Sequence, residues 1–271
     1  LSIQKWADVR KINVNWSTLK DFFEELKRKK PMLNFGTLVG HATLRRSVVG
    51  DKFNELTGKE LAQVTHLLTN ALAEGALGFS TGLVYSHAKA ADANEITSLV
   101  SAVGPRKMYS THLRNEEDKL YESVLEAIDA AKKTKVGVEI SHFKAVGKNN
   151  WPLFDKSLEA IEKAAKEGID INFDIYPYTS TATIFYTMLP DWIAVGGRAK
   201  LVENLKNPDL AKKAIEEMKG REEDFSNIII ASGNIDKTFI GKTISAISKN
   251  QGTNILETVI NRLLTAEGKL I

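Results

Sequence analysis

The feature that most constrains the fold is a repeated order of elements. A short apolar run is followed by a polar cluster and then by a longer segment with apolar residues three and four positions apart, as in 120–131. The apolar runs predict strands at 33–39, 76–80, 107–111, 136–141, 169–175 and 228–231. Strands that alternate with helices of this length predict parallel βαβ units, in either an open doubly wound sheet or a (β/α)8 barrel.

The boundaries of several elements are also readable. Thr57 followed by Glu60 predicts a capping box and a helix that starts just before Leu61. Pro31 is expected to stop the basic helix that ends in KRKK. The stretch 190–227 is the least regular and predicts an excursion from the main layer, followed by helices at 243–247 and 255–264. Since no Pro-, Gly- or Ser-rich linker divides the chain, we expect one domain over 1–271.

Charge and composition exclude several classes of protein. The net charge is +3, from 37 basic and 34 acidic residues, which does not predict a nucleic-acid-binding or membrane-binding surface. No apolar run is long enough to span a bilayer, and LSIQKWADVR has no signal-peptide pattern. The chain has no cysteine, so it offers neither disulfides nor a thiolate metal site, and we expect a cytoplasmic location.

Ionisable side chains follow three consecutive predicted strands. In parallel α/β folds, ligands bind at the carboxyl ends of the strands. The polar residues expected there are His112, Arg114, His142, Lys144, Asp174, Tyr176 and Tyr178. Two histidines on neighbouring strands suit a metal ion, because their imidazoles can approach it from two directions. The alternative is that each histidine is a hydrogen-bonded structural residue.

Lys144 follows His142 by two residues, so strand alternation predicts both side chains on one face. Lys144 is then either a cation that binds a substrate carboxylate or a solvated loop lysine. Asp174 either orients a ligand histidine or caps the next segment. The other histidines carry weaker signals: His66 is expected to be structural in the middle of a helix. His87 is expected in a loop without an evident partner, and His41, at a strand end, is left open.

Five stretches together resemble one family. LNFGTLVGHATLR, GALGFSTGLVY, YSTHLRNE, VEISHFKAVGKNNW and DIYPYTS, in this order, are similar to the N-acyl-D-amino-acid deacylases, or D-aminoacylases, of the metal-dependent amidohydrolase superfamily. The resemblance runs from about Trp16 to the C-terminal end. It implies a (β/α)8 TIM-barrel-like fold, a zinc cofactor, and hydrolysis of the amide bond of an N-acyl-D-amino acid.

The resemblance also implies roles for individual residues. His112 and His142 match the histidines that bind the tightly held zinc. Those that match substrate-binding positions are Lys144 and Tyr176, for the substrate carboxylate, and Tyr85, in the pocket. We further expect Asp174, His41 and Arg114 to contact and orient these residues without binding the metal or the substrate themselves.

The chain departs from the family pattern in what it lacks. The family's HxH pair, its zinc-binding cysteine and its general acid-base aspartate are expected outside this chain, the aspartate beyond residue 271. The chain is therefore expected to be an internal portion, with about strands three to seven of the barrel and an inserted element near 225–245. Such a portion has unpaired barrel edges and is predicted to self-associate through them.

Two other functions stay open on the sequence alone. One keeps the fold but changes the substrate to a cyclic amide, as in hydantoinases and dihydropyrimidinases. The other is a catalytically incomplete α/β fragment that binds a ligand or partner without turnover. A substrate carboxylate held by Lys144 separates the main hypothesis from the first alternative, and bound zinc separates it from the second.

Overall fold

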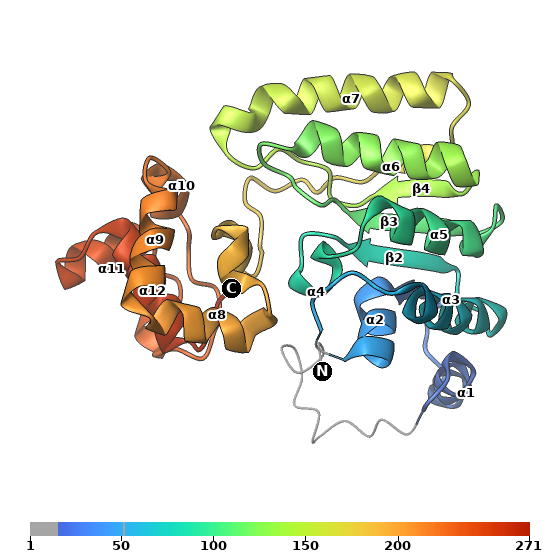
Figure 1. Cartoon of the computed structure of the whole chain (residues 1–271), viewed down its shortest axis with the longest axis horizontal. Helices are drawn as coiled ribbons and strands as arrows, with labels where there is room; N and C mark the ends of the chain where they lie inside the picture. The colour runs from blue at the N-terminus through green and yellow to red at the C-terminus, as the bar shows by residue number, and fades with distance from the viewer. Residues whose placement is uncertain (1–15, 51) are drawn as a thin grey trace.

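The centre of the molecule is a parallel sheet. The computed structural model describes residues 16–50 and 52–271 (Figure 1). Five strands pair in the order β1-β2-β3-β4-β5, which is also their order in the chain. They are β1 (Leu38–Gly40), β2 (Gly78–Gly82), β3 (Met108–His112), β4 (Gly137–Ile140) and β5 (Ile171–Phe173). All four pairings are parallel, as the alternation of strands and helices predicts.

Helix α1 (Leu19–Lys29) precedes β1, and helices connect the strands that follow. They are α2 (His41–Val49), α3 (Gly58–Ala73), α4 (Ser86–Lys89), α5 (Ala93–Val103), α6 (Leu120–Thr134) and α7 (Trp151–Lys166), with a 3-10 turn at Lys148–Asn150. The predicted capping box is confirmed, because Thr57 and Glu60 exchange side-chain to backbone hydrogen bonds at the start of α3. The basic helix α1 ends with Lys30 in the left-handed conformation, directly before Pro31.

The sheet buries alternate residues. Phe79, Tyr109, Val138 and Ile140 are buried in one hydrophobic cluster with the apolar faces of the helices. The residues between them are less buried, and they include Ser110 of β3. This alternation separates a helix-covered face from a more polar face, as in the wall of a barrel.

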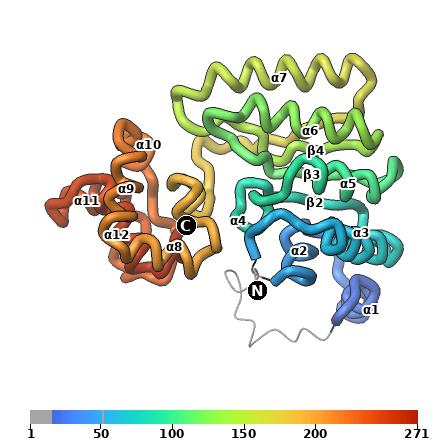
Figure 2. The backbone as a smooth tube through the Cα atoms, in the orientation of Figure 1, coloured from blue at the N-terminus to red at the C-terminus, as the bar shows by residue number. Residues whose placement is uncertain are grey.

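After β5 the chain leaves the sheet and builds a second hydrophobic cluster, here called the C-terminal lobe (185–271). Its helices are α8 (Gly197–Lys206), α9 (Pro208–Met218), α10 (Glu222–Ser226), α11 (Ile244–Gln251) and α12 (Ile255–Thr265), with 3-10 turns at Phe185–Met188, Asp191–Ala194 and Lys237–Phe239. The lobe lies beside the end of the sheet to which the strand arrows point (Figures 1 and 2). The preceding part of the chain (16–50 and 52–175) is called the βα half.

Three strand predictions are corrected. The run 169–175 forms a strand only over Ile171–Phe173. The run 33–39 becomes a strand only from Leu38, since Met32 and Leu33 are exposed and pair with no strand. The run 228–231 forms no strand: Ile229 makes a single antiparallel bridge to Thr243 within the C-terminal lobe. The excursion predicted at 190–227 is confirmed, but the inserted element near 225–245 is only part of a lobe that begins at 185.

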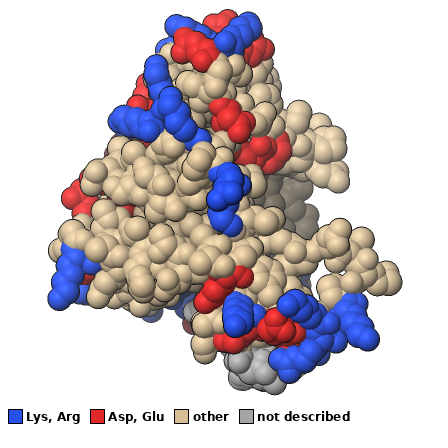
Figure 3. All heavy atoms as spheres, turned by 90° about the vertical axis from the view of Figure 1, so that its right-hand side faces the viewer, with Lys and Arg blue, Asp and Glu red and all other residues tan. Residues whose placement is uncertain are grey.

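The described surface carries charges of both signs. On the face shown in Figure 3, Lys and Arg groups lie next to Asp and Glu groups, around a broad uncharged area. Within the described residues, no helix is both long and apolar enough to cross a membrane. The stretch LSIQKWADVR lies outside the described residues. One domain over 1–271 stays a prediction, since the described residues divide between two hydrophobic clusters.

Candidate metal centre

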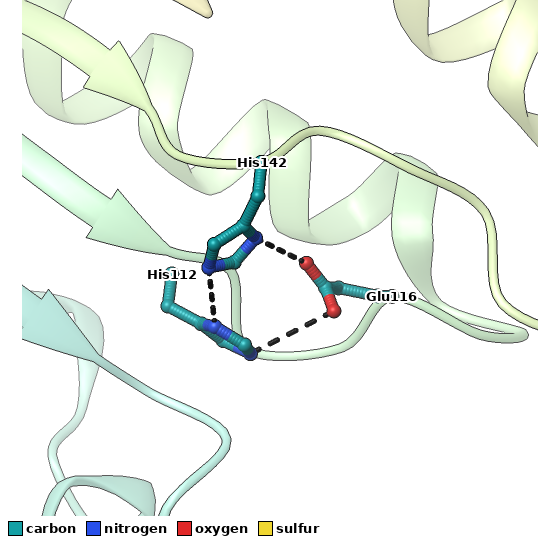
Figure 4. A group of neighbouring side chains, drawn as sticks. All are labelled: His112, Glu116 and His142. Carbon is teal, nitrogen blue, oxygen red and sulfur yellow. Dashed lines mark hydrogen bonds and ion pairs between the residues drawn. The ribbon is translucent and has the colours of Figure 1, made fainter. Parts of the chain in front are cut away.

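The two predicted histidines meet at the carboxyl end of the sheet. His112 is the last residue of β3 and pairs in register with Gly82 of β2. His142 comes two residues after β4 ends at Ile140. Nδ1 of His112 and Nε2 of His142 lie 2.8 Å apart, with the two rings nearly perpendicular (Figure 4). Neighbouring parallel strands thus bring together two side chains that are 30 residues apart in sequence.

The backbone of His142 adopts an unusual conformation. Its φ is +44°, in the left-handed region that non-glycine residues rarely occupy, and such a conformation persists only where the surroundings enforce it. Asp174 supplies part of this support, because Oδ1 accepts a 2.7 Å hydrogen bond from the backbone N–H of His142. Asp174 therefore contacts the backbone of His142. The turn also corrects the argument from strand alternation: β4 has ended, and the turn, not the pleat, places His142 beside Lys144.

Glu116 completes the cluster, and the sequence analysis missed it. Its Oε1 lies 3.2 Å from Nδ1 of His142 and its Oε2 lies 3.7 Å from Nε2 of His112 (Figure 4). Glu116 is buried, and its carbonyl accepts a 2.7 Å hydrogen bond from the N–H of Val146. The signal was present in THLRNE, where the carboxylate follows His112 by four residues, but a loop separates them and no periodic pattern applies.

Lys144 is held inside the cluster. Its Nζ donates to Oε1 of Glu116 at 2.7 Å and to the carbonyl of His142 at 3.1 Å, and lies 3.0 Å from Nδ1 of His142. The ring of Tyr176 lies nearby, with its centroid 6.0 Å from the ammonium. Tyr85 packs against the other histidine, with 5.3 Å between its ring centroid and that of His112. The predicted zinc-binding and substrate-binding residues therefore lie around one point.

Burial and charge set the protonation of the cluster. Burial lowers the pKa of His112 to about 4, and the neighbouring His142 and Lys144 act in the same direction. Burial alone would raise the pKa of Glu116, but its close contact with His142, the nearby His112 and the ammonium of Lys144 lower it overall. At neutral pH the site thus combines a neutral imidazole at His112 with an ionised carboxylate. For Tyr85, burial raises the pKa of the phenol and keeps it protonated.

These residues fit a zinc ion. His112, Glu116 and His142 each offer a ligand atom, and these atoms lie within 4.8 Å of one another. Imidazole nitrogens are common zinc ligands, and a nearby carboxylate either binds the ion as well or supports a ligand histidine. In a tetrahedral zinc site two ligand nitrogens lie about 3.3 Å apart. The facing nitrogens of the two histidines, 2.8 Å apart, would reach this separation by a small side-chain movement.

The structure places Arg114 and His41 in other networks. Arg114 forms an ion pair with Glu126 at 2.7 Å and donates to backbone carbonyls of 89 and 91. His41 begins α2 and is fully buried, with Nε2 2.7 Å from Oε1 of Glu95. Both therefore hold helices around the site, and neither is among the residues that contact the paired imidazoles.

The two remaining histidines lie elsewhere in the βα half. His66 is in the middle of α3, as predicted, but it is exposed, and within the described residues its ring bonds to Asn70 of the same helix, so its role in the fold is small. His87 was expected in a loop without a partner. It lies in α4 instead, and its ring stacks on Phe53 with 4.6 Å between centroids.

Comparison with known proteins agrees with the family that the motifs indicate. No protein-family model matches the chain. A curated N-acyl-D-glutamate deacylase from Alcaligenes xylosoxydans xylosoxydans is 34% identical over 173 residues, which are 64% of this chain and 36% of that protein. The D-aminoacylase of the same organism is 31% identical over 201 residues, which are 73% of this chain and 40% of that protein.

Solved structures show the same relationship. An N-acyl-D-glutamate deacylase from Bordetella bronchiseptica, crystallised with zinc and a phosphonate inhibitor, matches with a TM-score of 0.72 and 26% identity, over 93% of this chain and 46% of that one. A D-aminoacylase assigned to a novel subset of amidohydrolases matches with a TM-score of 0.71 and 24% identity, over 91% and 45%. The predicted resemblance is confirmed: the chain shares a partial TIM-barrel-like fold with these relatives and spans less than half of their length.

Proposed function

We propose that this chain provides the zinc-binding and carboxylate-binding part of a deacylase that hydrolyses N-acyl-D-amino acids. The observation that carries the proposal is the meeting of His112 and His142 at the ends of β3 and β4, with Lys144 beside them. The names of the related proteins, which are deacylases of D-amino-acid derivatives, support this substrate class. None of those named here is a cyclic-amide hydrolase.

Each residue has a distinct task in this proposal. Bound zinc supplies a Lewis acid that polarises the scissile carbonyl and lowers the pKa of a water molecule. His112 and His142 hold the ion through neutral imidazole nitrogens. Lys144 binds the carboxylate of the substrate with help from Tyr176, which fixes the amide relative to the ion. Tyr85, packed on His112, forms the wall of the pocket on the β2 side.

The remaining groups are proposed to come from outside this chain. The cysteine ligand, the HxH pair and the aspartate that moves the proton from water to the leaving amine are all absent from its pattern. The whole chain, 1–271, then works as one part of a single barrel domain. The outer edges of β1 and β5 are where further strands would pair, and where self-association is expected if they do not.

The first test is the zinc content of the purified chain by elemental mass spectrometry. We expect near-stoichiometric zinc in the wild type, loss of zinc in His112→Ala and His142→Ala, and normal zinc in His66→Ala, the matched control on the exposed face of α3. A wild-type chain without zinc would contradict the proposal and favour a fragment that binds without turnover.

The second test separates the substrate classes. In a protein that also supplies the cysteine, the HxH pair and the aspartate, N-acetyl-D-glutamate and N-acetyl-D-alanine should be hydrolysed in preference to their L-enantiomers. Lys144→Ala should raise KM for both because it removes the carboxylate-binding cation. A hydantoin lacks that carboxylate. Turnover of a hydantoin that survives Lys144→Ala, without turnover of the linear amides, would replace this proposal with a cyclic-amide hydrolase.

A further inference from the structure

One ring nitrogen of His142 lies beside both a hydrogen-bond donor and a hydrogen-bond acceptor. Nδ1 of His142 lies 3.0 Å from Nζ of Lys144 and 3.2 Å from Oε1 of Glu116. An ammonium group only donates hydrogen bonds and an ionised carboxylate only accepts them. Nδ1 can therefore bond to Lys144 only when it carries a lone pair, and to Glu116 only when it carries a proton. The position of the ring proton of His142 decides between the two.

Without a metal, the shortest contacts have one consistent assignment. Lys144 donates to Nδ1 of His142, so the ring proton lies on Nε2. That proton is donated to Nδ1 of His112 across the 2.8 Å contact in Figure 4. His112 then carries its own proton on Nε2, which faces Oε2 of Glu116 at 3.7 Å. Lys144 also satisfies Oε1 of Glu116 at 2.7 Å.

A metal bound by the two facing nitrogens requires a different tautomer. Both Nδ1 of His112 and Nε2 of His142 must then present lone pairs. His112 already does so in the assignment above. His142 must carry its proton on Nδ1 instead, where the near acceptor is Oε1 of Glu116. A carboxylate that accepts the outward N–H of a ligand histidine is the usual support of a protein metal site.

We propose that Glu116 and Lys144 compete for the tautomer of His142. Glu116 is a positioning residue that holds the metal-binding tautomer, and Lys144 stabilises the metal-free one. Occupation of the site and the Lys144–Nδ1 contact exclude each other, so loading of the metal frees one of the three N–H donors of Lys144 for the substrate carboxylate. This inference rests on the proposed function, which supplies the ion and the carboxylate.

The competition orders the binding steps. Before the ion is present, Lys144 is held by Glu116, by the His142 carbonyl and by Nδ1. It has few donors left for a substrate. Once Nδ1 of His142 is protonated, two N–H groups, one from each histidine, face the oxygens of Glu116, and the ammonium loses the Nδ1 contact. Metal should therefore bind before the substrate.

The first experiment reads the tautomer directly in the metal-free 271-residue chain. Two-bond nitrogen–proton correlation spectra of 15N-histidine-labelled protein report which nitrogen carries the proton. We expect the proton of His142 on Nε2 in the wild type and on Nδ1 in Lys144→Met. Lys148→Met, which changes an exposed lysine in the same loop, should resemble the wild type. The same His142 tautomer in the wild type and Lys144→Met would overturn the inference.

The second experiment measures zinc affinity by competition with a chelator. Glu116→Gln should weaken zinc binding by about 10–100-fold, the usual effect of losing such a support. Glu117→Gln, the neighbouring control, should leave the affinity unchanged. Unchanged zinc affinity in Glu116→Gln would overturn this inference alone and leave the proposed function standing. Absence of zinc from the wild type would instead overturn the proposed function, while the tautomer measurement still decides whether Lys144 controls His142.

The third experiment distinguishes a positioning residue from a ligand. Cobalt(II) substituted for zinc reports its ligand set through its visible spectrum. If Glu116 acts through the histidines, Glu116→Gln should keep the band positions of the wild type at saturating cobalt and change only the concentration needed. Shifted bands at saturation would make Glu116 a direct ligand and contradict the positioning role.

Discussion

The βα half and the C-terminal lobe bury different kinds of side chain. Among the described residues, the buried charged groups all lie in the βα half: Arg45, Glu95 and Glu116, together with His41. The buried polar groups of the C-terminal lobe are uncharged: Asn204, Ser248 and Thr258. A parallel sheet directs residues from several strands to one edge, whereas the helices of the lobe pack mainly on each other. The candidate metal centre accordingly lies at the end of the sheet.

The C-terminal lobe lines one side of a cavity that it shares with the βα half. This cavity of about 250 Å³ lies between the two parts, lined on the βα side by residues such as Val84 and Lys89 and on the other by Tyr186 and Leu189. Val84 and Ser86 line this cavity on either side of Tyr85 in the sequence, and Tyr85 packs on His112. The lobe therefore lies near the candidate metal centre, whose histidines come from the strand ends.

The largest effect on stability is expected from breaking the buried ion pair of the βα half. Arg45→Ala leaves the buried carboxylate of Glu95 without the cation that now contacts both its oxygens, at 2.7 and 2.5 Å. Loss of one partner of a buried pair costs about 3–5 kcal/mol. Urea denaturation should show this loss, with Arg28→Ala, in an exposed pair on α1, as a control near zero. A loss as small as that of the control would contradict the comparison.

A slightly smaller effect is expected from a cavity in the C-terminal lobe. Leu263 is fully buried in α12, and Leu263→Ala should cost about 2–5 kcal/mol. If the two hydrophobic clusters unfold separately, hydrogen exchange will accelerate in the lobe while the exchange of β3 and β4 stays unchanged. Equal acceleration in both parts would contradict this separation and support one cooperative domain over 1–271.

The βα half was also the more predictable part from sequence. Its strands repeat at regular intervals with strong apolar runs, so five of the six predicted strands exist and all lie in this half. The strands predicted at 33–39 and 169–175 were too long, because an apolar residue such as Ile175 can be exposed just beyond the end of a strand. The strand predicted at 228–231 does not form, because a short apolar run can also pack inside a helical lobe.

The site was predictable only in part for a related reason. His112, His142 and Lys144 lie at or shortly after the ends of β3 and β4, and sequence patterns locate such strand ends. Glu116 reaches the same point from a loop whose path no periodicity describes. The exclusion of Arg114 and His41 from the site depends on partners on α5 and α6. Pairings between side chains so far apart in sequence depend on helix packing, which a single sequence does not specify.

Zinc binding should stabilise the βα half more than the C-terminal lobe. A ligand that binds only the folded state at about 100 times its Kd stabilises that state by about 2.7 kcal/mol. We expect slower hydrogen exchange on zinc addition in β3 and β4, which lead to His112 and His142, and no change in α12. His142→Ala should abolish the difference. Equal protection of α12 would mean that the lobe and the sheet form a single cooperative unit.

The smallest effect is expected from the ion pair between Arg221 and Glu117, which joins the two parts of the molecule, as the pair of Lys89 and Asp191 also does. Arg221, just before α10, lies 3.0 Å from Glu117, and both side chains are about one-third exposed, at 36% and 27%. Burial raises the pKa of Glu117, against the opposing charge of Arg221, so the carboxylate is costly to keep ionised and the net gain of the pair is small. A double-mutant cycle with Glu117→Gln and Arg221→Ala should give a coupling energy of about 0–1 kcal/mol. In that case the other contacts between the parts, which are the packing around the cavity and the ion pair of Lys89 and Asp191, hold the lobe in place. A coupling energy well above this range would mean that the loop carrying Glu116, next to Glu117, is fixed by the C-terminal lobe, and that the lobe helps to position the metal centre.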